Sequence, residues 1–276
     1  MHNIWQVDAK EQLRTLDGHP ACYLTLTDEK SGCWLGSLAF AYARICQVPL
    51  AEVRQRLIES FHRWGKAGAF RVDNGEPLGT PTLTMTSALS LWLIAMDVDV
   101  IFNKPRCPQQ NAVVEKMQCT SSRWAEVHRA TDLDDLQKRL DRESVLQRQG
   151  FSVKRLQGRT RLDAFPEIET SRRVYSHNDF DAHRVYGFLS KKLYTRKVSA
   201  CGTIGHYGQV YSVGARFKGR FVQLKFEAES QAWLVFDNQA LIKTIRAQHL
   251  SAERIQKLTV CQRTSKSSVS HEKSIT

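Results

Sequence analysis

The chain has 276 residues, of which 42% are hydrophobic, and its 40 Lys and Arg against 28 Asp and Glu give a net charge of +12. This apolar fraction supports a buried core in one large domain or two smaller ones and excludes wholesale disorder. The longest charge-free run, residues 77–96, contains prolines, a glycine and several threonines, so it predicts a loop and a buried helix rather than a membrane span. Residues 1–8 do not show the basic-then-apolar pattern of a secretion signal.

The first half of the chain predicts three consecutive strands and then alternating helices and strands. Residues 4–10 and 21–27 have strand character around an Asp-Gly turn, and 33–46 continue the meander. Helical apolar spacing begins after Pro49, a residue that a first helical turn tolerates. The elements expected after it are a strand at 70–72, a helix at 83–96, a strand at 98–102 and helices at 109–127 and 132–149. This order predicts an α/β fold with a mixed five-stranded sheet and helices on its faces.

The second half has a different character. Residues 150–195 are polar, basic and weakly periodic, which is typical of a linker, whereas 196–260 alternate short β-like runs with glycines and predict a small all-β barrel. The last residues are rich in Ser and Lys. We therefore expect a core at 1–130, a helix and basic linker at 131–195, a small barrel at 196–260 and a disordered tail at 261–276.

The net positive charge of the chain comes entirely from its second half. Residues 1–150 hold 18 basic and 18 acidic side chains, whereas residues 151–276 hold 22 basic and 10 acidic ones and so carry the whole +12. A polyanion such as DNA or RNA is the natural partner of such a segment, through counterion release from phosphates. A solvated basic surface is the alternative that charge alone leaves open.

Three carboxylates are predicted at the edge of the sheet where α/β proteins bind their ligands. Asp8 lies in the first strand, Asp73 ends the fourth, and Glu115 lies early in the helix that follows Pro108. Acidic groups that meet at one sheet edge repel each other unless cations lie between them, and Mg²⁺ prefers such oxygen ligands. Taken singly, Asp73 before Asn-Gly is more often a turn residue and Glu115 a solvated helix residue.

Four short motifs in order resemble the catalytic core of retroviral integrases and DDE transposases. They are Trp5-Gln6-Val7-Asp8, the segment 23–31 with Asp28 before Ser31, Val72-Asp73-Asn74-Gly75, and the run from Pro108 to Glu115. The resemblance covers about residues 4–130 and implies an RNase H-like fold. It also implies that Asp8, Asp73 and Glu115 are the catalytic residues and hold Mg²⁺ or Mn²⁺, as two ions, for DNA nicking and strand transfer by a 3′ hydroxyl.

The spacing of the motifs leaves one choice open. Sixty-four residues separate Asp8 from Asp73 and forty-one separate Asp73 from Glu115. The second interval is longer than is usual in the family, and the excess fits in the loop at 76–82, where an insertion costs little. Asp28 is the rival first ligand, but it ends a strand before a turn-like segment, which favours a structural role.

The resemblance extends to the barrel region, which is similar to the small C-terminal barrel of bacterial insertion-sequence transposases. It implies DNA, both element ends and target, as the partner, a homo-oligomer as the working form, and a cytoplasmic, nucleoid-associated location in bacteria. The candidate DNA-binding residues are Lys104, Arg106, Lys116, Arg172, Arg173, Lys191, Lys192, Arg196 and Lys197.

The chain has seven cysteines, an odd number without a Cys-x-x-Cys pair. This pattern agrees with reduced thiols and with no zinc finger.

Only seven residues precede Asp8, although such transposases usually carry a DNA-binding module before the core. Two readings follow from this departure. The first is a DDE-type transposase or integrase, whose start is misassigned or whose end recognition comes from another protein. The alternative is a truncated, non-catalytic DNA-binding regulator of transposition. A nuclease of the same fold is a weaker third reading.

Overall fold

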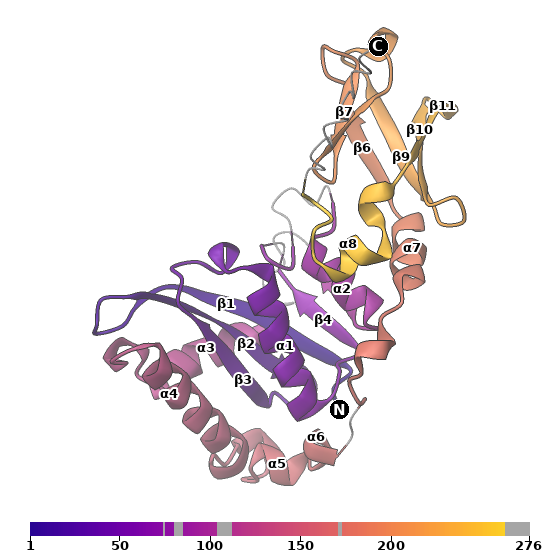
Figure 1. Ribbon diagram of the computed structural model, residues 1–276. Coiled ribbons are helices and arrows are strands. Elements are labelled where there is room, and N and C mark those ends of the chain that lie inside the picture. Colours follow the sequence, from indigo (N-terminus) through magenta and orange to yellow (C-terminus); the bar gives the residue numbers. More distant parts are fainter. Residues whose placement is uncertain (74, 80–84, 104–111, 171–172, 263–276) are drawn as a thin grey trace, which may run out of the picture.

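The computed structural model describes residues 1–73, 75–79, 85–103, 112–170 and 173–262. Its N-terminal part is built on one five-stranded sheet of order β3-β2-β1-β4-β5 (Figure 1). The five strands are β1 (Ile4–Arg14), β2 (Pro20–Asp28), β3 (Trp34–Phe40), β4 (Ala69–Val72) and β5 (Asp99–Phe102). The first three pair antiparallel, and β4 and β5 run parallel to β1. The predicted mixed five-stranded sheet is confirmed.

Helices cover both faces of this sheet because β1 buries side chains on both sides. On one face, Trp5 packs against Phe61 of α1 (Leu50–Trp64) with ring centroids 5.9 Å apart. On the other face, Tyr23 of β2 bonds to Ser121 and Ser122 of α3 (Ala112–Trp124), which lies beside α4 (Leu133–Val145). Each face thus has its own hydrophobic cluster.

Most predicted helices are observed with shorter bounds. The helix expected at 83–96 is α2 (Ala88–Ala95), which begins where Ser87 accepts a hydrogen bond from the Ser90 N–H. The helix expected at 132–149 is α4, followed by a π turn at Leu146–Gly150. The helix expected at 109–127 ends at Trp124, and residues 109–111 lie outside the described residues.

The expectation of a third strand over 33–46 is wrong beyond Phe40. The chain turns back toward β1, where the Gln12 N–H donates to the Ala43 carbonyl at 2.7 Å. The Ile45 N–H donates to the Glu11 carboxylate at 2.8 Å, and a 3₁₀ turn begins there. Side-chain and main-chain partners on β1 therefore replace a ladder with β2.

The segment predicted as a linker, 150–195, contains regular structure. Its helices are α5 (Arg161–Ala164), α6 (Glu167–Thr170) and α7 (Ala182–Ser190). The first two are single turns, which explains the weak periodicity, but α7 buries Val185 and Leu189 fully. It packs against α2 on one side and β9 on the other, so it joins the two halves of the molecule.

The C-terminal part is β-rich, as predicted. A four-stranded antiparallel sheet has the order β11-β10-β9-β6, and a separate hairpin pairs β7 with β8. The strands are β6 (Leu193–Lys197), β7 (Thr203–His206), β8 (Gln209–Ser212), β9 (Phe221–Glu227), β10 (Ala232–Asp237) and β11 (Ala240–Arg246). The described strands thus form an open sheet and a hairpin where the sequence suggested one barrel.

The C-terminal sheet and α4 lie at opposite ends of the molecule, with α2, α7 and α8 (Ala252–Gln256) between the two sheets (Figure 1). Of the expected tail, Cys261 and Gln262 belong to the described part, and Gln262 accepts a hydrogen bond from Gln209 at 2.9 Å. The domain boundaries at 130, 195 and 260 stay a prediction. No helix among the described residues is long and apolar enough to cross a membrane.

Candidate active site

The register of two parallel strands places Asp8 beside Asp73. Val7 of β1 pairs with Val72 of β4, and both are buried, so the residue after each points to the opposite face of the sheet. Asp8 is the first residue of β1 beyond its ladder with β4, and Asp73 is the first residue after β4. Both carboxylates therefore lie at the carboxyl edge of the parallel ladder, where α/β sheets place ligands.

The third carboxylate is brought to this edge by α3. Glu115 lies in the first turn of that helix and is exposed. The preceding residue, Val114, donates its N–H to the side-chain oxygen of Gln6 at 3.0 Å. Gln6 lies two residues before Asp8 and therefore points to the same face of β1. This bond fixes the start of α3 over the strand that carries Asp8.

The charges of Asp73 and Glu115 act on the carboxyl group of Asp8. Burial, the largest cause, and the charges of Asp73 and Glu115 together raise the pKa of Asp8 to about 6, while the Ala9 N–H, which donates to the Asp8 carboxylate at 2.9 Å, acts in the opposite direction. A cation placed between these groups would relieve the repulsion. The structure thus brings the three predicted catalytic residues into one electrostatic cluster.

The donor chemistry of the cluster fits a hard divalent ion, because all three groups are carboxylates. Among the described residues, however, no three His, Cys, Asp or Glu side chains are arranged to hold one metal ion. Asp73 also accepts a hydrogen bond from the Gly75 N–H at 3.0 Å, the turn role that its Asn-Gly neighbours suggested. A divalent ion held by these carboxylates would therefore take its remaining ligands from water or a phosphate.

A polar network beside the cluster was not predicted from the sequence. The Gln6 amide nitrogen donates to the Glu29 carboxylate at 2.9 Å, and the Arg71 guanidinium donates to the same carboxylate at 2.7 Å. Gln6 pairs with Arg71 across the parallel ladder. The sequence held one signal for this network. Gln6 and Arg71 each precede a predicted catalytic Asp by two positions, and residues two apart on a strand point to the same face.

Asp28, the rival ligand, has the structural role that the sequence favoured. Its side chain is 1% exposed and accepts hydrogen bonds from the main-chain N–H groups of His2 and Ser31 and from the Ser31 hydroxyl. These bonds fix the turn after β2 and leave the carboxylate turned into the protein.

Eight of the nine predicted DNA-binding residues divide into three groups. Lys104, Arg106 and Arg172 lie outside the described residues. Arg173 donates to the carbonyls of Ala67 and Asp97 and pairs with the Asp97 carboxylate, and Arg196 donates to the carbonyls of Gly205 and Thr195. The side chains exposed to solvent are Lys116, Lys191 and Lys197.

Lys192, the ninth predicted DNA-binding residue, is half-buried. Its ammonium nitrogen lies 4.2 Å from the ring centroid of Phe188 and 5.5 Å from that of Phe102, and burial lowers its pKa. Phe102 ends β5 and pairs with Val72, the residue before Asp73. The end of α7 therefore brings a cation to the same sheet edge as the carboxylate cluster.

Comparison with known proteins gives the following matches. No protein-family model matches the chain. The catalytic core domain of BIV integrase is 14% identical, with a TM-score of 0.43 over 62% of this chain and 98% of that one. The HTLV-2 integrase catalytic core in complex with magnesium is also 14% identical, with a TM-score of 0.41 over 58% and 93%. The simian T-cell lymphotropic virus intasome in complex with PP2A regulatory subunit B56 gamma is 13% identical, with a TM-score of 0.45 over 90% and 77%. At these TM-scores the likenesses assign neither a family nor an activity.

Proposed function

We propose that the chain is a DNA strand transferase of the integrase and DDE transposase type, with its chemistry at Asp8, Asp73 and Glu115. The observation that carries the proposal is the electrostatic coupling of Asp8 to both other carboxylates at the end of a parallel ladder. This is the placement that the four sequence motifs imply. A divalent ion bound there would activate an attacking oxygen and stabilise a leaving oxygen on phosphorus.

In this proposal some residues supply charge and others hold the charged groups in position. Asp8 and Asp73 offer carboxylates from a rigid sheet edge, and Gln6 holds the first turn of α3 so that Glu115 stays near them. Sites on strands and helices keep the geometry that an in-line phosphoryl transfer requires. Lys192 lies at the same edge and can contribute positive charge toward a DNA phosphate.

The test is nicking and joining of supercoiled plasmid DNA in the presence of Mn²⁺ or Mg²⁺. We expect Glu115→Gln to lose at least about 100-fold in nicking, because it removes one charge from the proposed ion-binding set without changing side-chain size, while DNA binding persists. The matched control is Glu52→Gln, an exposed residue of α1 with the same change of charge.

Equal nicking by Glu115→Gln and the natural chain would overturn the assignment. DNA binding without nicking in every variant, the natural chain included, would instead support the non-catalytic regulator. Release of short fragments with no joined product would favour a nuclease at the same carboxylates.

A further inference from the structure

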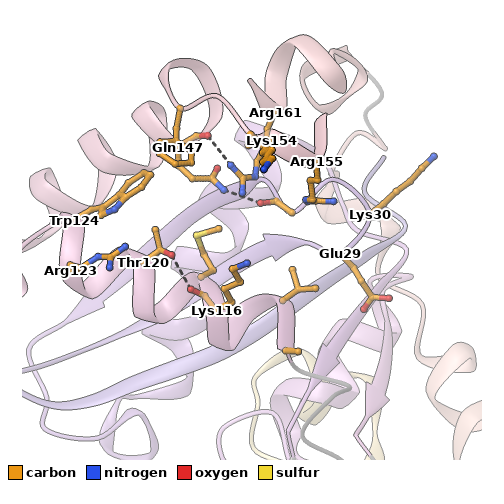
Figure 2. Close-up of a pocket in the computed structure, with 16 residues that line it drawn as sticks. Glu29, Lys30, Lys116, Thr120, Arg123, Trp124, Gln147, Lys154, Arg155 and Arg161 are labelled. Atoms are coloured by element: carbon orange, nitrogen blue, oxygen red, sulfur yellow. Dashed lines mark hydrogen bonds between the residues drawn. The ribbon is translucent and has the colours of Figure 1, made fainter. Parts of the chain in front are cut away.

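A groove of about 740 Å³ follows α3, and Lys116, the residue after Glu115, is one of its lining residues (Figure 2). One wall is the helix itself, through Val113, Lys116, Thr120 and Arg123. The opposite walls are the turn after β2, at residues 29–32, and the segment 147–161. We call this cavity the α3 groove.

The wall opposite α3 is held in place by buried hydrogen bonds. The Gln147 side chain, which is 1% exposed, donates to the Gly32 carbonyl at 2.9 Å and accepts from the Trp34 N–H at 3.1 Å. Arg155 donates to the Ser31 carbonyl at 3.3 Å. Gly32 has φ +67°, and a Cβ there would lie 3.1 Å from the Arg155 guanidinium, so this position favours glycine. The α3 groove is therefore preformed.

The lining of the α3 groove is strongly basic. Its basic side chains are Lys30, Lys116, Arg123, Lys154, Arg155 and Arg161. Within the described part of the chain, no Asp or Glu carboxylate forms an ion pair with any of these six. The one carboxylate of the lining, Glu29, is already bonded to Arg71 and Gln6. This unbalanced charge favours a polyanion as the ligand.

Trp124 lies at the end of the α3 groove that is distant from Glu29 (Figure 2), and a second aromatic ring, that of Phe151, also lines the groove. Trp124 ends α3 and packs against Phe151 with ring centroids 5.0 Å apart. Phe151 is 46% exposed although it is a large apolar side chain. Exposed rings within a basic groove are the combination by which proteins bind unpaired nucleotides, because each base offers a face for stacking.

We propose that the α3 groove binds a single-stranded segment of nucleic acid, with phosphates on the basic side chains and a base on Trp124 and Phe151. An acidic peptide would match the charge but would leave the exposed ring without a stacking partner. A duplex keeps its bases stacked internally and away from the rings. The inference rests on the proposed function in that the groove would hold an unpaired strand leading to or from the carboxylate cluster.

The test measures binding of a fluorescein-labelled 12-nucleotide oligothymidylate to the full chain by fluorescence anisotropy, in EDTA and at several salt concentrations. We expect the double substitution Lys116→Ala with Arg123→Ala to weaken binding at least tenfold. The slope of log affinity against log salt should become shallower by about 1.4, since each lost phosphate contact on a single strand contributes about 0.7. Phe151→Ala should weaken binding by about fivefold or more, and it should keep the fold because Phe151 is exposed.

The matched control is Arg129→Ala with Lys138→Ala, which removes the same charge from exposed residues outside the α3 groove. Equal weakening by this control would overturn the proposal, as would equally tight binding of a duplex or of poly-glutamate. Glu115→Gln should keep the affinity for the oligonucleotide. Failure of this binding test is thus distinct from failure of the nicking test, which needs metal and an intact Glu115.

Discussion

At the scale of single residues, Gln6 joins three parts of the candidate site. Its side-chain oxygen accepts from the N–H of Val114 and its nitrogen donates to Glu29, which also binds Arg71. The strand pattern and motifs predicted Asp8 and Asp73, because alternation and chain order are local properties. The role of Gln6 could not be predicted in the same way, since its partner on α3 is 108 residues away.

We predict that Gln6→Ala lowers nicking at least tenfold while the fold persists. The substitution leaves the Val114 N–H without its partner and frees the first turn of α3, so Glu115 loses its fixed position. The cost in the free energy of unfolding should be about 1–3 kcal/mol, the usual cost of a buried group left unsatisfied. Nicking assays and urea unfolding of the same preparations measure the two effects.

The control for Gln6→Ala is Gln12→Ala, which changes an exposed glutamine on the same strand. Parallel losses of activity in both variants would show that β1 tolerates no substitution and would remove the positioning role of Gln6. Loss of DNA binding along with nicking in Gln6→Ala would point to a wider disturbance of the site.

We predict that Asp8→Asn stabilises the metal-free protein at pH 8. The pKa of Asp8 is raised from 3.8 to about 6, so the stabilising contribution of its protonated form is present below pH 4 and is lost as the pH rises through 6. Above pH 6 the charged carboxylate costs about 1–3 kcal/mol, which the neutral amide avoids. Thermal unfolding in EDTA measures this difference.

Addition of Mg²⁺ or Mn²⁺ should reverse the order of the two proteins. The natural chain should gain stability because the cation relieves repulsion among Asp8, Asp73 and Glu115, whereas Asp8→Asn should gain much less. Asp141→Asn serves as the control, because Asp141 also has a raised pKa but lies on α4. An equal response of all three proteins to metal would exclude an ion at Asp8.

At the scale of elements, sequence periodicity predicted those elements whose pattern is long and clear. The helix after Pro49 has its buried residues at the expected positions, and the strands of the five-stranded sheet were placed within a few residues except at the end of β3. The helix α7 was missed because its nine residues lie in a basic segment. Its partners, α2 and β9, are distant in sequence, so local pattern could not reveal its burial.

Two buried histidines, His206 of β7 and His249 in the turn after β11, lie beside Trp233 of the C-terminal sheet. His249 bonds to the Tyr211 hydroxyl at 2.7 Å and lies 3.5 Å from the Trp233 indole nitrogen. Burial, the larger cause, and the charge of Arg254 together lower its pKa to about 4. His206 is buried nearby, and burial with the charge of Arg196 lowers its pKa to about 2. Both rings are therefore neutral in the folded protein at pH 7.

We predict that the chain loses stability as the pH falls from 6.5 toward 4. An unfolded histidine binds a proton near pH 6.5, so the contribution of a neutral buried His249 is fully present above that pH and is lost as the pH falls through 4. His249→Gln should remove about 2–3 kcal/mol of this loss between pH 7 and 4.5. Urea unfolding at each pH measures it, and His183→Gln, an exposed histidine on α7, is the control. Equal pH dependence in the two variants would contradict the prediction.

At the scale of the whole molecule, one hydrophobic cluster runs from the five-stranded sheet to the C-terminal sheet. It includes Trp5 of β1, Leu189 of α7 and Trp233 of β10. Polar contacts follow the same path, since Asp181 donates its N–H to the Ala95 carbonyl and the Tyr186 hydroxyl donates to the Leu250 carbonyl. The charge asymmetry between the halves suggested two separate parts, but the packing connects them, which the charge pattern could not show.

We predict from this continuous core that both sheets unfold together and that Leu189→Ala destabilises both. Leu189 is fully buried where α7 packs against α2 and β9, so its truncation leaves a cavity and should cost about 2–5 kcal/mol. Hydrogen exchange of β1 and β10 amides in the natural chain and in Leu189→Ala measures the two sheets separately. Leu16→Ala, at a 68% exposed leucine, should leave both unchanged. Faster exchange in β10 alone would contradict the prediction, because it would mean that the C-terminal sheet unfolds independently of the five-stranded sheet that carries the carboxylate cluster.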